Sequence, residues 1–357
     1  MTGTVEASFP RHAYLEIAPF VCPSNWLVTA RSHLVDRFVA DCERIDLGPC
    51  TVRGGGMNMS LDEIKSDYRP GRKRARLRGV TRRQVPTGRI LYDVRDKSPA
   101  NIAHFIDDHL PILFCMMQAF DLTFEQILIA LPADIPDYIC AAAEVFGLET
   151  WKTDDPVDGL TVSSDVWRAG PQIRAIRHEW VRIPWVADRL DMALAAEQER
   201  PAALPRRVFL SRRKTRTLEN EAEVEAFLAD WGFVKVYAED FPVLDQFRLF
   251  REAEAIVAVH GAALAPLLYV PRDGRLTHLV ELMPCGHMTN VYRVVSAHVN
   301  VSWAAVRGRL KPEYVRPAYD LTQPFKKYSL DSFSIDPQAI AMAFAMQQIH
   351  KQERPRG

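Results

Sequence analysis

The stretch "EAIVAVHGAALAPLLYVP", residues Glu254 to Pro271, decides the fold that this sequence predicts. Its run from Ile256 to Val259 is short and wholly apolar, which is typical of a strand buried on both faces of a parallel sheet. His260 and Gly261 follow at once, and the apolar segment after them predicts a helix. Ligands of open α/β sheets bind outside the carboxyl ends of the strands, so this pair stands where a ligand site is expected.

The same alternation of strand and helix extends on both sides of this stretch, from Arg206 to about Val306. Apolar or alternating runs predict further strands at 207–211, 233–237, 277–283 and 301–306. Apolar residues at helical spacing predict helices at 220–232, 242–254 and 290–299. Strands and helices that alternate over short connections predict a parallel sheet with helices on both faces.

The first half of the chain follows the same pattern less regularly. It predicts strands at 89–94, 124–131 and 148–152, a helical stretch at 98–120 broken near Pro111, and a helix at 135–147. A second αβ unit is therefore expected from about residue 85 to 185. A further helix leads into a linker rich in proline and alanine, so the domain boundary is expected near Pro201 to Pro205.

Length and composition narrow the class of protein. A chain of 357 residues favours two domains, and 45 basic residues balance 45 acidic ones, so no overall charge attracts nucleic acid. The first twenty residues lack a basic start followed by an apolar core, and no uncharged run suffices to span a membrane, so we expect a cytoplasmic protein without a signal peptide. Six scattered cysteines fit reduced thiols better than disulfides or a zinc site.

A basic segment, "SRRKTR", directly follows the strand predicted at 207–211. Arginine forks match phosphate oxygens two at a time, so the segment suits a diphosphate, although charged runs also form ordinary solvated loops. The candidate donor-binding residues here are Ser211, Arg212, Arg213 and Lys214.

His260, Gly261 and Ala262 are the candidates at the end of the central strand. Glycine lets the backbone approach a ligand closely, and the start of a helix presents N–H groups and a positive dipole end to phosphate. The alternative is that Gly261 makes a tight turn and His260 caps a loop. A G-x-G-x-x-G fingerprint is absent, which disfavours a nicotinamide-dependent dehydrogenase.

Two polar residues lie further along the same predicted sheet edge. Glu281 closes the strand at 277–283, where a carboxylate can accept hydrogen bonds from ribose hydroxyls, and Asn290 opens the next helix. The alternatives are a salt bridge or a helix cap for Glu281, and a helix cap for Asn290.

In the first half, the segment "NIAHFIDDH" carries His104, Asp107 and Asp108 on a predicted helix. A histidine can take the proton of a hydroxyl near neutral pH, and an adjacent carboxylate can orient it, so His104 is the candidate catalytic base. The alternative is a structural histidine on an amphipathic helix. A divalent-metal site is disfavoured, because adjacent carboxylates of a helix point apart.

The segment "RPGRKRARLRGVTRR", residues 69–83, carries eight basic residues and no acidic one. Two interpretations stay open: a solvated loop, or a surface for an anionic acceptor or the cytoplasmic membrane leaflet, which attracts polybasic segments. The residues assigned to this patch are Arg72, Lys73, Arg74 and Arg76.

Four segments together resemble glycosyltransferase family 61 in order and spacing, over about residues 100 to 300. They are "NIAHFIDDHLPIL", "FLSRRKTRTLENEAEV", "LFREAEAIVAVHGAALAPLLYVP" and "LVELMP". The matching family features are an N-x-x-H segment, an S-R-R/K segment with an N-E helix start, an H-G-A-(G/A)-L segment, and a strand that ends in glutamate. Ala263, Pro266 and Ala103 depart from the commonest family pattern.

The resemblance implies a GT-B fold, with two Rossmann-like αβα domains facing each other across a cleft. It also implies transfer of a sugar with inversion, without an essential metal or another cofactor. On this interpretation His260, Gly261 and Ala262 hold the diphosphate of a nucleotide-sugar, and Arg212, Arg213 and Lys214 neutralise the leaving group. Glu281 then binds the nucleoside, and His104 acts as the base with Asp107 or Asp108 as orienting group or substitute.

The expected domains are an acceptor-side domain at 1–200, irregular over 1–85, a nucleotide-sugar domain at 201–330, and a helix at 331–357 that can pack back on the first domain. The expected partners are a UDP-sugar and a glycan or lipid-linked glycan, as in bacterial capsule or other surface polysaccharide synthesis. Contact with the inner face of the membrane is an option. Two rivals stay open: a sulfo- or phosphotransferase acting on glycans, and a non-catalytic nucleotide-sugar sensor or scaffold.

Overall fold

The computed structural model describes part of the chain in full and part by its backbone alone. The full description covers residues 83–95, 99–110, 113–114, 117, 122–155, 189–197, 203–284, 291–309, 311 and 330–351, without the side chains of Asp108, Val294, Ala297 and His298. The backbone alone is described at 2–8, 20–21, 37–43, 50–51, 69–70, 157–158, 161–163 and 184–188. The chain divides into two compact units, one of residues 1–10 with 35–197 and one of residues 11–34 with 198–357.

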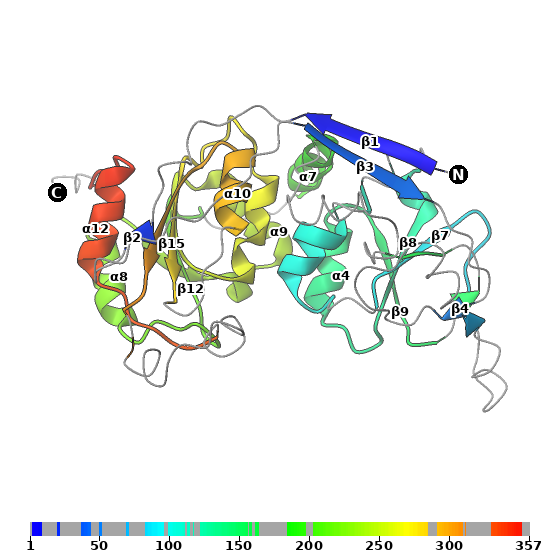
Figure 1. Ribbon diagram of the computed structural model, residues 1–357, viewed down its shortest axis with the longest axis horizontal. Coiled ribbons are helices and arrows are strands. Elements are labelled where there is room, and N and C mark those ends of the chain that lie inside the picture. The colour runs from blue at the N-terminus through cyan, green and yellow to red at the C-terminus, as the bar shows by residue number, and fades with distance from the viewer. Residues whose placement is uncertain are drawn as a thin grey trace. The chain divides into compact units, whose positions relative to one another are not determined.

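The second unit is built on a six-stranded, all-parallel sheet (Figure 1). Its strands are β12 (Arg207–Ser211), β13 (Val234–Tyr237), β14 (Ala255–Val259), β15 (His278–Met283), β16 (Ser302–Arg307) and β2 (Phe20–Val21). Their order is β13-β12-β14-β15-β16-β2, so the strands that follow the linker are arranged as 2-1-3-4-5. This is a doubly wound order, and its direction reverses between β12 and β14.

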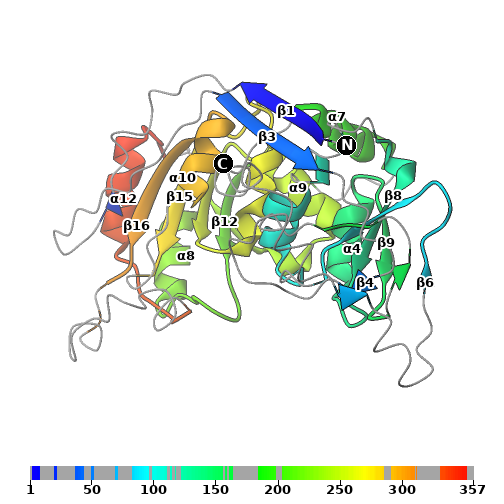
Figure 2. The same ribbon diagram turned by 45° about the vertical axis from the view of Figure 1, so that its right-hand side comes forward.

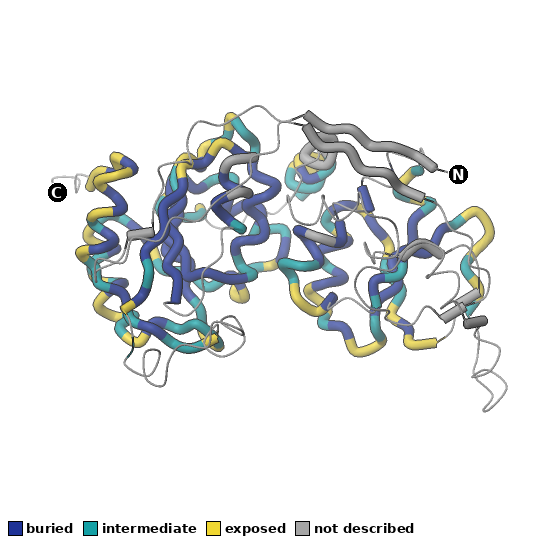
Figure 3. The backbone as a smooth tube through the Cα atoms, viewed as in Figure 1, coloured by how far each residue is buried: buried dark blue, intermediate teal, exposed yellow. Residues whose placement is uncertain are grey.

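Helices cover both faces of this sheet. Helices α8 (Glu221–Ala229) and α12 (Pro337–Met346) pack on one face, and α9 (Val243–Glu252), the 3-10 helix η4 (Ala262–Tyr269) and α10 (Val291–His298) pack together on the other (Figure 2). All five residues of β14 are buried, which is why this strand is apolar without alternation (Figure 3). The α/β class and the parallel sheet predicted from the sequence are therefore confirmed.

The segment after Gly261 is helical, as the sequence predicts. It is a 3-10 helix, with Pro266 inside it. Proline has no N–H to donate to the carbonyl four residues earlier, and its ring crowds that carbonyl, so an α-helix is disfavoured over these residues.

Helix α12 belongs to the core of the second unit. Its residues Ile340, Ala343 and Phe344 belong to the same buried cluster as Phe209 and Leu228 of the second unit. The helix therefore packs on the six-stranded sheet, beside α8. Asp336 caps its start by accepting a hydrogen bond of 3.0 Å from the backbone N–H of Gln338.

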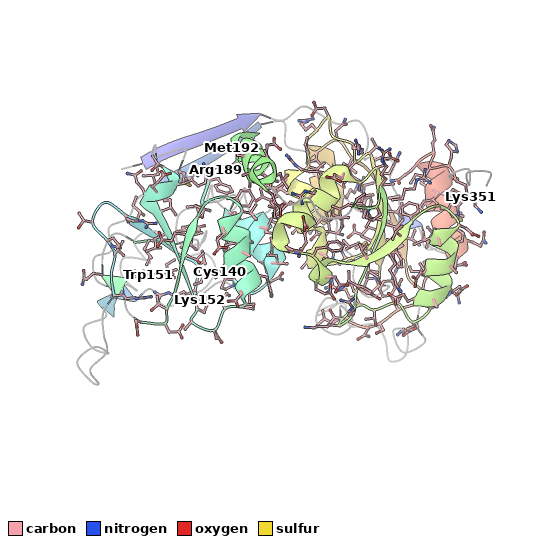
Figure 4. The ribbon with its side chains drawn as sticks, turned by 180° about the vertical axis from the view of Figure 1, so that it is seen from behind. Cys140, Trp151, Lys152, Arg189, Met192 and Lys351 are labelled. Atoms are coloured by element: carbon pink, nitrogen blue, oxygen red, sulfur yellow. The ribbon has the colours of Figure 1, made fainter. Side chains whose placement is uncertain are left out.

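The first unit carries a four-stranded parallel sheet of order β11-β7-β8-β9. The strands are β7 (Ile90–Asp93), β8 (Ile127–Leu131), β9 (Glu149–Lys152) and β11 (Thr161–Ser163). Trp151 and Lys152 of β9 are labelled in Figure 4: the guanidinium of Arg83 lies 4.3 Å from the Trp151 ring, and Lys152 pairs with Asp137 at 2.5 Å. These contacts attach the edge strand to its surroundings.

The remaining elements of the first unit are helices and short strand pairs. The helices are a π-helical turn η1 (His104–His109), a 3-10 turn η2 (Phe124–Gln126), α4 (Asp137–Glu144) and α7 (Pro184–Ala196). The pairs are antiparallel β1 (Thr2–Ser8) with β3 (Arg37–Glu43), antiparallel β4 (Cys50–Thr51) with β5 (Arg69–Pro70), and parallel β6 (Arg83–Gln84) with β10 (Val157–Asp158). Within the described residues, no helix is long and apolar enough to cross a membrane.

Candidate functional site

The candidate site of the second unit lies where the strand order reverses, at the carboxyl ends of β12 and β14. These strands are neighbours in the sheet, with Leu210 opposite Ala258, so the residues that follow them emerge side by side. Arg212 donates a hydrogen bond of 3.1 Å from its guanidinium to the backbone carbonyl of His260, which ties the two strand ends together. In doubly wound folds this reversal opens a crevice in which ligands bind.

His260 is held by a buried carboxylate. Its Nδ1 contacts Glu281 Oε1, and the other oxygen, Oε2, accepts a hydrogen bond of 2.9 Å from the indole Nε1–H of Trp303. All three side chains are buried, and Glu281 is only 1% exposed. The carboxylate therefore fixes the orientation of the imidazole.

Gly261 has a specific role in seating Arg212. A Cβ at this position would lie 1.3 Å from one terminal nitrogen of the Arg212 guanidinium and 2.6 Å from its central carbon. The Arg212 guanidinium therefore packs directly over the backbone of Gly261, where only a glycine leaves room for it. Tyr292 also contacts this backbone, since its hydroxyl donates a hydrogen bond of 3.0 Å to the Gly261 carbonyl.

Arg216 brings a second half-buried guanidinium to this region. Its backbone adopts the left-handed conformation, with φ of 56°, and its N–H donates to the carbonyl of Leu330 at 3.0 Å. The pKa of Arg216 is lowered to about 10, mainly by burial and to a lesser extent by the positive charge of Arg212. Two cations brought together and partly desolvated in this way are typical of an anion-binding site.

Burial likewise lowers the pKa of the Arg212 guanidinium, against the opposing influence of Tyr292 and Glu239. A bound dianion would relieve both the desolvation and the mutual repulsion of Arg212 and Arg216. The electrostatics of the site therefore favour a diphosphate over a neutral ligand.

The other basic residues of this loop have partners or lie open to solvent. Arg213 forms a two-pronged ion pair with Asp240, at 2.5 and 2.6 Å, and its guanidinium lies 3.8 Å from the ring of Tyr237. Lys214 is exposed, whereas Ser211 is buried and donates to Glu221. Their roles as donor-binding residues stay predictions.

In the first unit, His104 begins the π-helical turn that follows β7. Such turns interrupt α-helices at functional sites more often than elsewhere. His104 is half-buried, and Asp107 is buried at 4% exposure, on the side of the turn that faces the core. The carbonyl of His109, at the end of the turn, accepts a hydrogen bond of 3.0 Å from Tyr92 of β7.

Some predicted residues lie outside the described part of the chain. These are Asn290, the side chain of Asp108, and the basic patch Arg72, Lys73, Arg74 and Arg76. Two further candidates were not predicted from the sequence, namely Arg216 within "SRRKTR" and Trp303. Only Arg216 had a detectable signal, its place in a basic segment after a strand.

Comparisons with known proteins show which family this chain resembles. Residues 102–277 match the family model described as Glycosyltransferase 61, a range that includes His104, Arg212 and His260. The beta-1,2-xylosyltransferase XAX1 of Oryza sativa subsp. japonica is 34% identical over 99 residues, which are 26% of this chain and 17% of that protein. This chain spans less than a fifth of that relative's length, and its residues 102–277 are similar to glycosyltransferase family 61.

Proposed function

We propose that this protein is a glycosyltransferase that moves a sugar from a nucleotide-sugar, with UDP-sugars as the first choice, to a hydroxyl of a glycan acceptor. The match of residues 102–277 to the family 61 model supports the reaction class. The main observation behind the proposal is that the Arg212 guanidinium packs on Gly261 and hydrogen-bonds the carbonyl of His260. This contact lies where the strand order of the second unit reverses. A diphosphate that binds there meets positive charge and backbone N–H groups.

The leaving group of such a transfer is a nucleoside diphosphate, on which negative charge develops as the glycosidic bond breaks. Arg212 and Arg216 stabilise that charge in a partly desolvated place, where electrostatic interactions are stronger than in water. We propose that these cations, with His260, do this without an essential metal. Glu281 has both oxygens engaged inside the protein, and this supports a role in orienting His260 over direct contact with a ribose.

We further propose that transfer inverts the anomeric carbon, in a single displacement with a base on the acceptor side. His104 is our choice of base, because an imidazole takes a hydroxyl proton near neutral pH and this one is half-buried at the start of a π-helical turn. The reaction would need the two units to face each other in a GT-B arrangement. Capsule or other surface polysaccharides are the proposed products.

The identity of the sugar is a separate proposal. The relative from rice is described as a beta-1,2-xylosyltransferase, which makes UDP-xylose a suitable first donor to test. The aligned part is short on both chains, so other UDP-sugars belong in the same screen.

A thermal-shift screen of the purified protein tests the donor site. Candidates are UDP, GDP, CMP and their sugar conjugates, each with and without magnesium. A ligand at about a hundred times its Kd stabilises the native state by about 2.7 kcal/mol, which raises Tm. We expect one nucleotide to raise Tm without magnesium, and Arg212→Ala to abolish the shift. Absence of a shift with every nucleotide would contradict the proposal.

A further inference from the structure

The Arg212 guanidinium is held at both of its terminal nitrogens. One of them, Nη1, donates a hydrogen bond of 3.1 Å to the backbone carbonyl of His260, and the other, Nη2, donates one of 3.1 Å to the hydroxyl oxygen of Thr215. A guanidinium is planar, so two bonds from different nitrogens to different partners fix the direction of its plane, whereas one bond lets it swing. Thr215 therefore shares with His260 the orientation of Arg212.

These two bonds leave part of the guanidinium for a ligand. A guanidinium has five N–H donors, and among the described residues only His260 and Thr215 engage two of them, so three donors remain. No described carboxylate forms an ion pair with Arg212 either, in contrast to Arg213, which Asp240 neutralises. Neighbouring N–H donors of such a group match two oxygens of one phosphate, provided that the plane of the guanidinium is already oriented.

Thr215 can anchor Arg212 because its loop is attached on both sides. The loop begins at the end of the buried strand β12. After Thr215, the N–H of Arg216 donates to the carbonyl of Leu330 at 3.0 Å, and the N–H of Glu219 donates to that of Phe333 at 2.8 Å. Both acceptors precede α12, which packs in the core of the second unit. The loop therefore holds the Thr215 hydroxyl in a defined place.

We propose that Thr215 is a positioning residue of the donor site, which orients the Arg212 guanidinium for the diphosphate of the nucleotide-sugar before that ligand binds. This inference rests on the proposed function of Arg212 and adds the residue that prepares it. Thr215 acts through Arg212 and does not itself contact the diphosphate. Its hydroxyl improves affinity because a long side chain that is ordered in advance loses less conformational freedom when the ligand binds.

Thr215→Val tests the proposal, because valine has nearly the same shape as threonine and lacks the hydroxyl oxygen. The probe is UDP, and isothermal titration calorimetry on the full chain gives its Kd. We expect Kd to rise about threefold to tenfold, since Arg212 keeps its bond to His260 and loses the other. Thr215→Ser retains a hydroxyl oxygen, and we expect its Kd to stay within about twofold of the wild-type value.

Thr217→Val is the matched control. Thr217 is half-buried in the same loop, and its hydroxyl pairs with that of Ser332 at 2.7 Å. The substitution therefore removes one hydroxyl from the loop and leaves both described bonds of the Arg212 guanidinium intact. We expect Thr217→Val to bind UDP like the wild type, and urea denaturation checks that the two valine variants have similar unfolding free energies.

The behaviour of Arg212 without ligand distinguishes positioning from direct contact with the diphosphate. In ¹⁵N NMR of arginine-labelled protein, a guanidinium that is held gives two separate Nη signals, and rotation about its Nε–Cζ bond exchanges them. We expect separate signals for Arg212, identified by their absence in Arg212→Lys. Their exchange should be faster in Thr215→Val than in the wild type or in Thr217→Val, and equal exchange in all three proteins would overturn the proposal.

The outcomes separate this inference from the proposed function. If the wild type does not bind UDP, or if Arg212→Ala binds it as well as the wild type does, the proposed UDP-sugar function fails and the inference with it. If UDP binding needs Arg212 but Thr215→Val binds like the wild type, only the inference is overturned. Equal losses of affinity in Thr215→Val and Thr215→Ser, or in Thr215→Val and Thr217→Val, would also overturn only the inference. Should Thr215→Val fail to fold, Thr215→Ala takes its place in each comparison.

Discussion

Gly261 and Arg212 show how one residue without a side chain can position another. The guanidinium occupies the space that a Cβ at residue 261 would take, and it bonds the carbonyl of His260 from there. Two of the residues proposed to contact the diphosphate are thereby fixed relative to each other by backbone contacts. The strained left-handed backbone of Arg216, four positions further along the loop, belongs to the same arrangement.

At this scale we predict the effect of Gly261→Ala. The new Cβ would overlap the terminal nitrogen of Arg212, and this flexible side chain would have to move away and lose its bond to His260. Only the end of a long side chain is displaced, so unfolding free energy should change by no more than about 1 kcal/mol. Affinity for the stabilising nucleotide should fall roughly tenfold or more, as a charge-assisted hydrogen bond is lost.

A double-mutant cycle supplies the control for this prediction. If Gly261→Ala acts through Arg212, then combining it with Arg212→Ala should weaken nucleotide binding no further than Arg212→Ala alone. Additive losses of affinity, measured by calorimetry, would contradict the mechanism.

At the scale of elements, α12 supplies much of the cover on one face of the six-stranded sheet. Phe344 is fully buried, stacks on Phe233 at 5.4 Å between ring centroids, and meets Trp231 edge-on at 4.8 Å. The helix joins the sheet from the far end of the sequence, so its packing stabilises the second unit through contacts between distant parts of the chain.

We predict that Phe344→Ala destabilises the protein by about 3 to 5 kcal/mol, because it removes a buried aromatic side chain and leaves a cavity. The matched control is Met342→Ala on the same helix. Met342 is 59% exposed, and its loss should change unfolding free energy by about 0.5 kcal/mol or less. Urea denaturation of both variants measures the difference, and similar effects would show that α12 does not pack as described.

At the scale of the whole molecule, the two units are not two consecutive halves of the chain. Residues 11–34 belong with the second unit, and β2 within them pairs with the outer strand β16 through Val21 and Val306. The other limit between the units falls after Glu197, just before the proline-rich stretch that predicted a linker. The second unit therefore includes a segment from near the start of the chain.

Truncation from the N-terminus tests this arrangement. A chain that begins at residue 11 loses β1, which pairs only with β3 among the described strands, whereas a chain that begins at residue 35 also loses β2 and exposes the edge of β16. We expect the second truncation to lower the Tm of the nucleotide-stabilised protein by several degrees more than the first, since about 1 kcal/mol shifts Tm by about 2 to 4 °C in domains of this size. Equal Tm values would count against β2 as part of the second unit.

The sequence by itself determined the class of fold, the strands and helices from Arg207 to Arg307, and the place of His260 and Arg212 at a sheet edge. These features follow from the local spacing of apolar residues and from the residues that directly follow each strand, and both can be read from the sequence. Only the tertiary structure decided that Arg212 occupies the space above Gly261, that Glu281 serves His260 and Trp303, and that α12 and β2 join the same sheet. The physical reason is that these contacts join residues that are distant in sequence. Packing in three dimensions selects such partners, and the local pattern of apolar and polar residues does not reveal them.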